Sequence, residues 1–348
     1  MEVAFHAGGE QPVSPPGVSA VVIVHGAPPS TVDACIESFL ASLAVDIHVV
    51  LVDNASPDGG LACSRWATHA QITVLTSVRN DGFAAGVNQG LGLVRANDFI
   101  LLLNDDAFVT ADAVALLVAK LENNPQAIAC APRVMLANEP DRIDSLGLVL
   151  RPSGEAFNAY IGQPWSEQMP DGADILGPCF GAALFRPGAF DAATGVGPLD
   201  ERYRLYYEDV DWVLRAQQRG WRSVLCTSAV VFHQHAASTR LLGEAVRYEL
   251  VQRNLLLCAA KNLAWRSALE VWIKRLIVHA KGTLTGPYRT QRVRSLLRAA
   301  WGLPATLRAR RALPRRQSQR GDAELFGYST GLNPQFDVTT YRSGQTTN

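Results

Sequence analysis

Short apolar runs alternate with amphipathic segments through the first third of the chain. Four apolar runs of strand length occupy residues 18–24, 47–52, 72–75 and 99–103. Each is followed by a segment whose apolar positions recur at helical spacing, at residues 30–43, 61–70, 86–96 and 111–122. This order, with strands that are apolar throughout, predicts a parallel sheet covered by helices on both faces.

Polar side chains follow two of these predicted strands. Asp53 ends the second run, and Asn104, Asp105 and Asp106 follow the fourth. Ligands of such sheets sit beyond the carboxyl ends of the strands, so both groups should share one crevice. Adjacent carboxylates repel each other, which favours a bound cation at 104–106. The alternative is that these residues cap the helix at 111–122.

The second half of the chain is less regular. Residues 140–178 are rich in Gly, Pro and polar side chains, which predicts a loop. An apolar segment (180–185), a helix (213–219) and two short strands (223–225 and 229–232) are predicted next. From residue 244 to about 301 the spacing is helical, and residues 321–348 are expected to form an extended polar tail.

Two further clusters carry candidate chemistry. Glu208, Asp209 and Asp211 lie within four positions, where mutual repulsion raises a carboxylate pKa towards the range of a general base. The alternative is that these residues simply form an acidic helix N-terminus, which the helix dipole favours. A further alternative is a division of roles, with Asp209 catalytic and Asp211 capping the helix. His233 and His235 alternate along a strand and face opposite sides, so at most one of them faces a given site. A structural role is the alternative to a role as a ligand, unless His233 converges on Asp106.

Charge is segregated along the chain, although 32 basic and 32 acidic side chains cancel. Residues 1–260 hold 16 basic against 28 acidic side chains, and residues 261–320 hold 15 against one. A solvated helical face and a nucleic-acid surface are two explanations, but no nucleic-acid-binding motif accompanies the basic region. Trp265, Trp272 and Trp301 interleave with Arg and Lys, which favours an anionic membrane surface as its partner.

Several protein classes are excluded. No apolar run reaches the roughly 18–20 residues of a spanning helix, and the N-terminus lacks the basic start of a secretory signal. The six cysteines form no CxxC pair, and their flanks predict buried, reduced thiols. Dinucleotide-binding and P-loop motifs are missing. A cytoplasmic protein, peripheral at the inner face of the membrane, is expected.

Five ordered motifs resemble those of the inverting family-2 glycosyltransferases, whose fold is GT-A. They are VDNAS (52–56), NDGFAAGVN (80–88), LLLNDD (101–106), GPLDERYRLYYEDVDW (197–212) and FHQHAAS (232–238). The resemblance covers about residues 18–260 and is strongest to the rhamnosyltransferase and galactofuranosyltransferase-like branch. It implies an α/β fold with a Rossmann-like mixed sheet, helices on both faces and a basic helical region after it.

The resemblance implies a role for each matched residue. Asp53 would contact the base or ribose of a nucleotide-sugar donor, and Asp209 would be the catalytic base. Asp106 and His233 would contact Mg²⁺ or Mn²⁺ and the donor diphosphate. The other implied donor-binding residues are Asn80, Gly82, Asn88, Asn104 and Asp105. The chain departs from the family pattern at residues 25–28, where relatives carry an Asn-rich turn, and at Gly197-Pro198 in place of Gly-Gly.

The implied function is transfer of a sugar, with inversion, to a glycan or lipid-linked acceptor of a cell-surface polysaccharide. The expected donor is dTDP-rhamnose, and a UDP-hexose is the alternative donor. The alternative function is that of a catalytically silent scaffold that binds a nucleotide or glycan. A nucleotidyltransferase would need a Gly-rich loop after the first strand, which residues 25–29 do not supply. The expected division is a lead-in (1–17), a GT-A domain (18–240), a basic helical region (241–320) and the tail (321–348).

Overall fold

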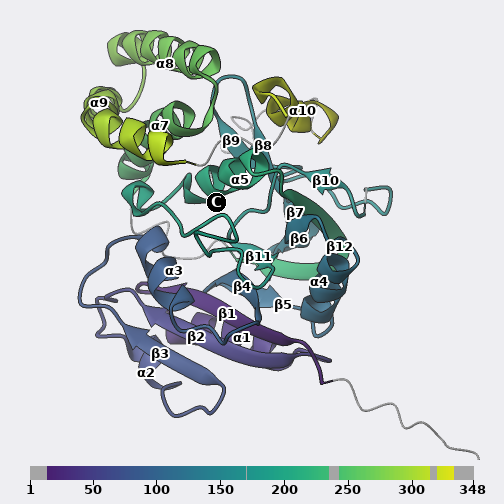
Figure 1. The fold of residues 1–348 in the computed structure, drawn as a ribbon. Helices are drawn as coiled ribbons and strands as arrows, with labels where there is room; N and C mark the ends of the chain where they lie inside the picture. Colours follow the sequence, from purple (N-terminus) through teal and green to yellow (C-terminus); the bar gives the residue numbers. More distant parts are fainter. Residues whose placement is uncertain (1–13, 170, 235–242, 314–319, 333–348) are drawn as a thin grey trace, which may run out of the picture.

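A computed structural model describes residues 14–169, 171–234, 243–313 and 320–332 of the chain. One sheet runs through the molecule, and a group of long helices stacks beyond one side of it (Figure 1). In the described ranges the sheet has ten strands, and the main path through it is β10-β12-β6-β11-β4-β1-β2-β3. β5 pairs with β12, β7 pairs with β6, and β8 and β9 form a separate hairpin.

The strands are short and mostly buried. Their bounds are β1 (Gly17–Val24), β2 (Asp46–Asp53), β3 (Ile72–Thr76), β4 (Phe99–Asn104), β5 (Ala107–Val109), β6 (Ala127–Leu136), β7 (Glu139–Ser145), β8 (Leu148–Leu150), β9 (Ala156–Asn158), β10 (Asp174–Ile175), β11 (Ala182–Phe185) and β12 (Arg222–His233). The strands β1 to β4 are parallel, as the pattern predicts. β11 lies antiparallel between β4 and β6, which makes the sheet mixed.

Helices cover both faces of the sheet. They are α1 (Pro29–Leu40), α2 (Leu61–Ser64), α3 (Phe83–Leu91), α4 (Ala113–Glu122), the 3-10 turn η1 (Glu201–Tyr203), α5 (Glu208–Gln218), α7 (Glu244–Asn262), α8 (Trp265–Thr285), α9 (Arg289–Ala312) and α10 (Asp322–Leu332). None of them, within the described ranges, has the length and apolar composition of a membrane-spanning segment.

Two core clusters lie on opposite faces of the sheet. Alternate strand residues such as Val21 and Leu102 face a cluster that includes α3 and α5, whereas Val22 and Leu101 face α1 and α4. The first cluster also contains buried residues of α7, among them Leu256. The C-terminal helices therefore share the main core with the body of the protein.

Several predicted elements differ from the structure. The helix predicted at 61–70 is the single turn α2, after which the chain continues in turns. Residues 140–178, predicted as loop, contain most of β7 and all of β8, β9 and β10. These strands are short, and the exposed residues of β7 are Glu139, Pro140 and Asp141, which do not form a strand pattern. The two strands predicted at 223–225 and 229–232 are one strand, β12, with a register shift between Cys226 and Val230.

The C-terminal part of the chain also differs from its prediction. Residues 322–332, expected to be extended, form α10 because Leu325 is buried and Phe326 and Tyr328 pack against the main core. The carboxylate of Asp322 accepts a hydrogen bond from the backbone N–H of Ala264 at 2.8 Å. The remainder of the predicted tail, residues 333–348, and residues 1–13 of the lead-in lie outside the described residues.

The six cysteines are free thiols, as expected for a reduced protein. Five of them are buried, and Cys179 is partly exposed.

Candidate active site

The end of β2 forms the first wall of the candidate site. Asp53 is its last residue and is buried, and its Oδ1 accepts a hydrogen bond from the backbone N–H of Ser56 at 2.9 Å. Gly60 lies so close that a Cβ there would come within 2.3 Å of Asp53 Oδ2, and its φ of +77° also favours glycine. The Asp53 carboxylate is therefore held rigidly at the strand end.

The turn after β1 is tied to this wall. His25 Nδ1 lies 2.9 Å from the carbonyl oxygen of Asn54, and the backbone N–H of Gly26 donates to Ser56 Oγ at 3.1 Å. Asn54 Nδ2 in turn donates to Asn80 Oδ1 at 3.2 Å. The departure from the family pattern at residues 25–28 is thus accommodated by a turn that hydrogen bonds directly to the end of β2.

The predicted donor-binding residues of the 80–88 motif connect two loops. Asn80 Oδ1 accepts the backbone N–H of Gly82 at 2.9 Å. Gly82 has a φ of +99°, and a Cβ there would meet the carbonyl oxygen of Arg204 at 2.5 Å. Asn88 exchanges two 2.9 Å hydrogen bonds with the backbone of Leu199 and also donates to Glu201. In this structure Asn88 holds the 199–201 loop, and its contact with a donor stays a prediction.

The ends of β4 and β12 bring together the residues predicted to bind metal. His233 Nε2 lies 3.1 Å from Asp106 Oδ1 and 3.2 Å from Asn104 Nδ2. His233 Nδ1 lies 2.8 Å from Asp144 Oδ2. Burial alone would lower the pKa of His233, but the hydrogen bonds with both aspartates outweigh it and raise the pKa to about 10. His233 therefore converges on Asp106, which was the condition for a role at the site, whereas His235 lies outside the described residues.

Asp144 is a member of this cluster that the sequence did not reveal. It lies in β7, inside the segment predicted as loop, and is buried. No motif surrounds it, and only the pairing of β7 with β6 brings it to His233.

Asp105 has a buried carboxylate oxygen without a hydrogen-bond partner in the described residues. This atom is Oδ2, and the residue as a whole is buried. Burial and then the neighbouring Asp106 raise its pKa to about 7, although His233 and the backbone N–H of His25 oppose the shift. An orphaned buried carboxylate oxygen beside a second carboxylate fits a divalent cation, whose preferred ligands are oxygens.

The cation would need ligands from outside the protein. Within the described ranges, no three His, Cys, Asp or Glu side chains are arranged to enclose a metal. A diphosphate and water would complete such a site, as is usual for Mg²⁺. The alternative that residues 104–106 cap the next helix is wrong, because α4 begins at Ala113 after Asp112.

Asp209 stands in the first turn of α5, beside Glu208. Burial raises the pKa of Asp209 to about 6, and burial together with the Asp209 charge raises that of Glu208 to about 8. Burial and, after it, the Asp209 carboxylate also raise the pKa of Cys179, and Asp144 adds to that shift. Both carboxylates therefore lie near Cys179. The backbone N–H of Phe180 donates to Asp209, and the carbonyl oxygen of the next residue, Gly181, accepts the backbone N–H of Asn104 at 2.9 Å, so Asp209 lies beside the end of β4.

The chain turns sharply before α5. Arg204, Tyr206 and Tyr207 all have φ between +63° and +73°, a region that non-glycine residues rarely occupy. Asn254 of α7 stabilises this turn, because its Nδ2 donates to the carbonyl oxygens of Tyr203, Leu205 and Tyr206 at 2.8–3.0 Å.

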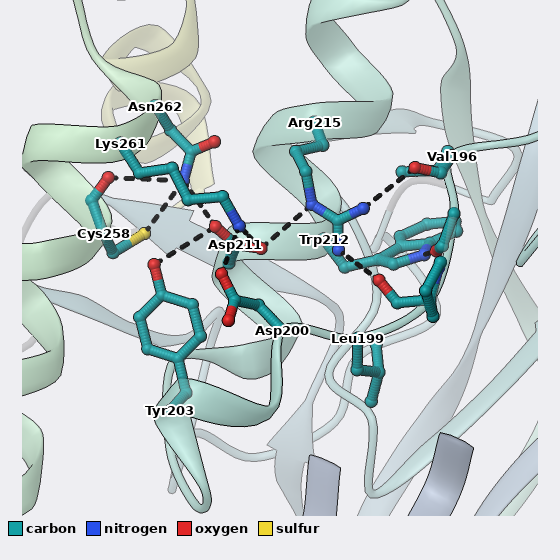
Figure 2. A network of polar contacts seen from close by, with 12 residues as sticks. Val196, Leu199, Asp200, Tyr203, Asp211, Trp212, Arg215, Cys258, Lys261 and Asn262 are labelled. Carbon is teal, nitrogen blue, oxygen red and sulfur yellow. Dashed lines mark hydrogen bonds and ion pairs between the residues drawn. The ribbon is translucent and has the colours of Figure 1, made fainter. Parts of the chain in front are cut away.

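Asp211 does not cap α5, although the sequence suggested a capping role for it beside a catalytic Asp209. It is fully buried in a network shown in Figure 2, where it accepts hydrogen bonds from Arg215, Lys261, Asn262 and Tyr203 at 2.7–3.1 Å. Burial would raise its pKa, but Lys261 and Arg215 lower it. Lys261 also pairs with Asp200 at 2.6 Å, so α7 anchors both the 200–204 segment and α5.

The assembled site can perform one type of chemistry well. A carboxylate with a pKa near 6 is suited to take a proton from a hydroxyl at neutral pH. The carboxylates at the ends of β2 and β4 lie where sheets of this kind bind nucleotides. The sequence-predicted residues Asp53, Asp105, Asp106, His233 and Asp209 therefore lie around the carboxyl ends of β2 and β4.

Comparison with known proteins agrees with this arrangement. Residues 19–187 match the protein family Glycosyl transferase family 2. The chain is 29% identical over 233 residues to an N-acetylglucosaminyl-diphospho-decaprenol L-rhamnosyltransferase of Mycobacterium tuberculosis, a match that covers 59% of this chain and 73% of that protein. The same protein from a second strain matches equally well.

Three solved structures are similar at 13–17% identity, a level at which similarity shows the fold alone. The crystal structure of GalNAc-T7 with UDP, GalNAc and Mn²⁺ has a TM-score of 0.57 and covers 83% of this chain, which spans 57% of that longer chain. TarS 1–349 of S. aureus has a TM-score of 0.54, with 92% and 94% of the two chains covered. The mannosyltransferase PcManGT from Pyrobaculum calidifontis, in complex with GDP-Man and Mn²⁺, has a TM-score of 0.50, with 94% and 83% covered. Motifs, sheet topology and these similarities lead to the same conclusion: residues 19–187 of this chain are a Glycosyl transferase family 2 domain, and the protein is a glycosyltransferase with a GT-A fold.

Proposed function

We propose that this protein is an inverting, divalent-metal-dependent rhamnosyltransferase that uses dTDP-rhamnose and a lipid-linked acceptor in cell-surface polysaccharide synthesis. The observation that supports the proposal is the cluster of Asp105, Asp106 and His233 after β4, with Asp53 at the end of β2 and Asp209 beside the end of β4. The choice of rhamnose and of a lipid-linked acceptor is supported by the similarity to the mycobacterial rhamnosyltransferase.

The residues would divide the reaction as follows. Asp53 holds the nucleoside, and Asp209 takes the proton of the acceptor hydroxyl as that oxygen attacks the anomeric carbon. Asp106, with Asp105 and His233 beside it, would hold Mg²⁺ or Mn²⁺, whose contribution is to neutralise charge on the departing diphosphate. A single displacement from the face opposite the leaving group inverts the anomeric centre, with an oxocarbenium-like transition state.

The C-terminal helices support a location at a membrane surface. Exposed apolar side chains lie along one side of α8, which we call the α8 face: Trp265, Leu269, Ile273, Leu276, Ile277 and Leu284. Arg266, Lys274 and Lys281 are exposed on the same helix. Apolar side chains flanked by basic ones are typical of a helix that lies on anionic lipid. A peripheral position at the inner face of the cell membrane would bring the enzyme to a lipid-linked acceptor.

A thermal-shift panel tests the donor. The protein is heated with dTDP, UDP, GDP or CDP, each with Mn²⁺, Mg²⁺ or EDTA, since a ligand of the native state raises the midpoint by mass action. We expect a metal-dependent shift with dTDP that is lost in Asp106→Asn. A shift with UDP in place of dTDP would contradict the rhamnose assignment and favour a UDP-hexose donor. A panel without any shift would favour a catalytically silent scaffold.

A further inference from the structure

A basic cavity lies apart from the candidate active site, and neither Asp209 nor His233 lines it. Its volume is about 260 Å³, and it opens between α7, α9 and the loop that follows η1. The lining residues are Arg204, Leu250, Arg253, Arg298, Trp301 and Gly302. Three of the six are arginines and none is acidic, so the cavity is electrostatically suited to an anion.

The positive charge of the cavity is only partly neutralised. Arg298 pairs with Glu249, a buried neighbour on α7, which leaves two of the three guanidinium charges without a carboxylate partner in the described structure. Burial, opposed in part by Tyr203, lowers the pKa of Arg253, and the nearby Arg298 charge lowers it further. A bound anion would relieve this repulsion. Guanidinium groups present planar pairs of donors that match phosphate oxygens.

Apolar side chains continue from the cavity along α9. Trp301 is 89% exposed, and Leu297, one turn earlier on the same side of the helix, is 65% exposed. Val293 extends this apolar strip by another turn. A ligand that fits the cavity and the strip together is anionic at one end and a hydrocarbon at the other.

The position of the cavity relates it to the reaction. The carbonyl oxygen of Arg204 accepts the N–H of Ala84 at 3.2 Å, and its side-chain Nη2 donates to the carbonyl oxygen of Asn80, so both backbone and side chain are tied to the 80–84 segment. Arg204 precedes Asp209 by five residues, so their Cα atoms are at most about 19 Å apart. A sugar joined to an anion in the cavity can therefore extend towards the catalytic base.

We infer that this cavity binds the diphosphate of a polyprenyl-diphosphate-linked acceptor, with the first part of the lipid along Trp301 and Leu297. The inference rests on the proposed function, because it assigns the acceptor end of the same active site. It is distinct from the donor site, where Asp105 and Asp106 would meet the nucleotide diphosphate.

The test is calorimetric titration of the full-length protein in EDTA, so that no metal holds diphosphate at Asp106. Farnesyl diphosphate is the probe, and farnesol and inorganic diphosphate represent its two halves. We expect the probe to bind at least about tenfold tighter than either half, because each half makes only part of the contacts. Soluble dihexanoylphosphatidylglycerol should not compete, since it carries a single phosphodiester.

Variants on α9 locate the site. Arg298→Gln should weaken binding of farnesyl diphosphate about tenfold, as expected for loss of a hydrogen-bonded charge. Arg294→Gln, one turn away and exposed, is the matched control and should bind as the wild type does. Trp301→Ala removes an exposed side chain and should weaken farnesyl diphosphate while leaving inorganic diphosphate unchanged.

Three results would overturn the inference: equal binding by Arg298→Gln and Arg294→Gln, equal affinity for the probe and either half, or displacement by the phospholipid. The nucleotide thermal shift is measured on the same protein preparations, with Mn²⁺ or Mg²⁺ in place of EDTA. Absence of a nucleotide shift in the wild type would refute the proposed donor chemistry. The acceptor site is decided by the farnesyl diphosphate titrations of the wild type and of Arg298→Gln.

Discussion

A carboxylate accepts protons near neutral pH only when its surroundings disfavour the charged form. In this protein the neighbours Glu208 and Asp209 both have raised pKa values, near 8 and 6 respectively, and burial is the main cause of each shift. The two carboxylates also repel each other, so ionisation of both at once is disfavoured. Two adjacent acids that are not easily ionised together suit a division of roles, in which Asp209 is the proposed base.

Asp209→Asn should abolish transfer while leaving donor binding intact, because the amide keeps the shape of the carboxylate and cannot accept the proton. Loss of a general base typically costs about 10²- to 10⁴-fold in rate. The measurement is transfer by the purified variant, with the nucleotide thermal shift as the binding readout. Asp112→Asn, the same change at an exposed position, is the control. Substantial transfer by Asp209→Asn would remove Asp209 from this role.

The pH dependence of kcat/KM should show an acid limb near pH 6. Because the pKa of Asp209 is raised to about 6, the base is ionised above that value and becomes protonated as the pH falls through it. The rate should then fall about tenfold for each pH unit below 6. A profile that stays flat down to pH 4.5 would be inconsistent with a base in this environment.

At the scale of elements, α7 connects the C-terminal helices to the active site. Its inward side carries Asn254, Lys261 and Asn262, all buried and all hydrogen bonded to the 200–211 segment. Their partners lie about 50 residues earlier in the chain, so helical periodicity could not reveal them. The polar side of α7 is thus a structural support for α5 and for the left-handed turn before it.

Lys261→Met should destabilise the protein by about 3–5 kcal/mol, because it removes the cation shared by the buried carboxylates of Asp200 and Asp211. Urea unfolding at pH 7 measures the change. Arg266→Met is the control, since that side chain is 93% exposed and should change stability by less than about 0.5 kcal/mol.

The same variant has a predictable dependence on pH. The native pKa of Asp211 lies below its ordinary value of 3.8, so the pairing stabilises the fold above that value and is lost as the pH falls below it. The difference in unfolding free energy between the wild type and Lys261→Met should therefore shrink below pH 4. A difference that is already small at pH 7 would show that Arg215 alone compensates Asp211.

At the scale of the whole molecule, charge and apolar surface are separated. Residues 1–260 are acidic overall, whereas residues 261–320 hold 15 basic side chains and one acid. The helices α8 and α9 lie at the opposite end of the molecule from β2 and β3 (Figure 1). This polarity would orient the basic helices towards an anionic surface.

Flotation with anionic vesicles tests the α8 face. We expect the wild type to float at low salt, and less protein to float as salt screens the basic side chains. The double variant Ile273→Ser/Ile277→Ser should float less, because it removes apolar side chains that are each about half exposed. Leu43→Ser, a comparable change at a 62% exposed position far from α8 in the chain, is the control. Failure of the wild type to bind at low salt would reject the membrane surface as a partner.

The sequence determined the features that depend on local periodicity. The strands β1 to β4 are continuous apolar runs, and their order predicted both the parallel half of the sheet and the edge where Asp53 and Asp106 lie. The motif around Asp209 was recognisable because its residues are close together in the chain. These features need only short-range patterns and the general geometry of a parallel sheet.

Only the tertiary structure decided the contacts between distant segments. Asp144 reaches His233 across 89 positions through the pairing of β7 with β6 and of β6 with β12, and β7 has no strong strand pattern. The sequence predicted a helix cap at Asp211, whereas in the structure Asp211 pairs with Lys261, 50 positions later. Such pairs depend on how helices and strands pack, and a buried charge or a polar residue in a short strand has no local signature. Local pattern therefore determined the strand ends and the candidate base, whereas packing determined which side chains hold them in place.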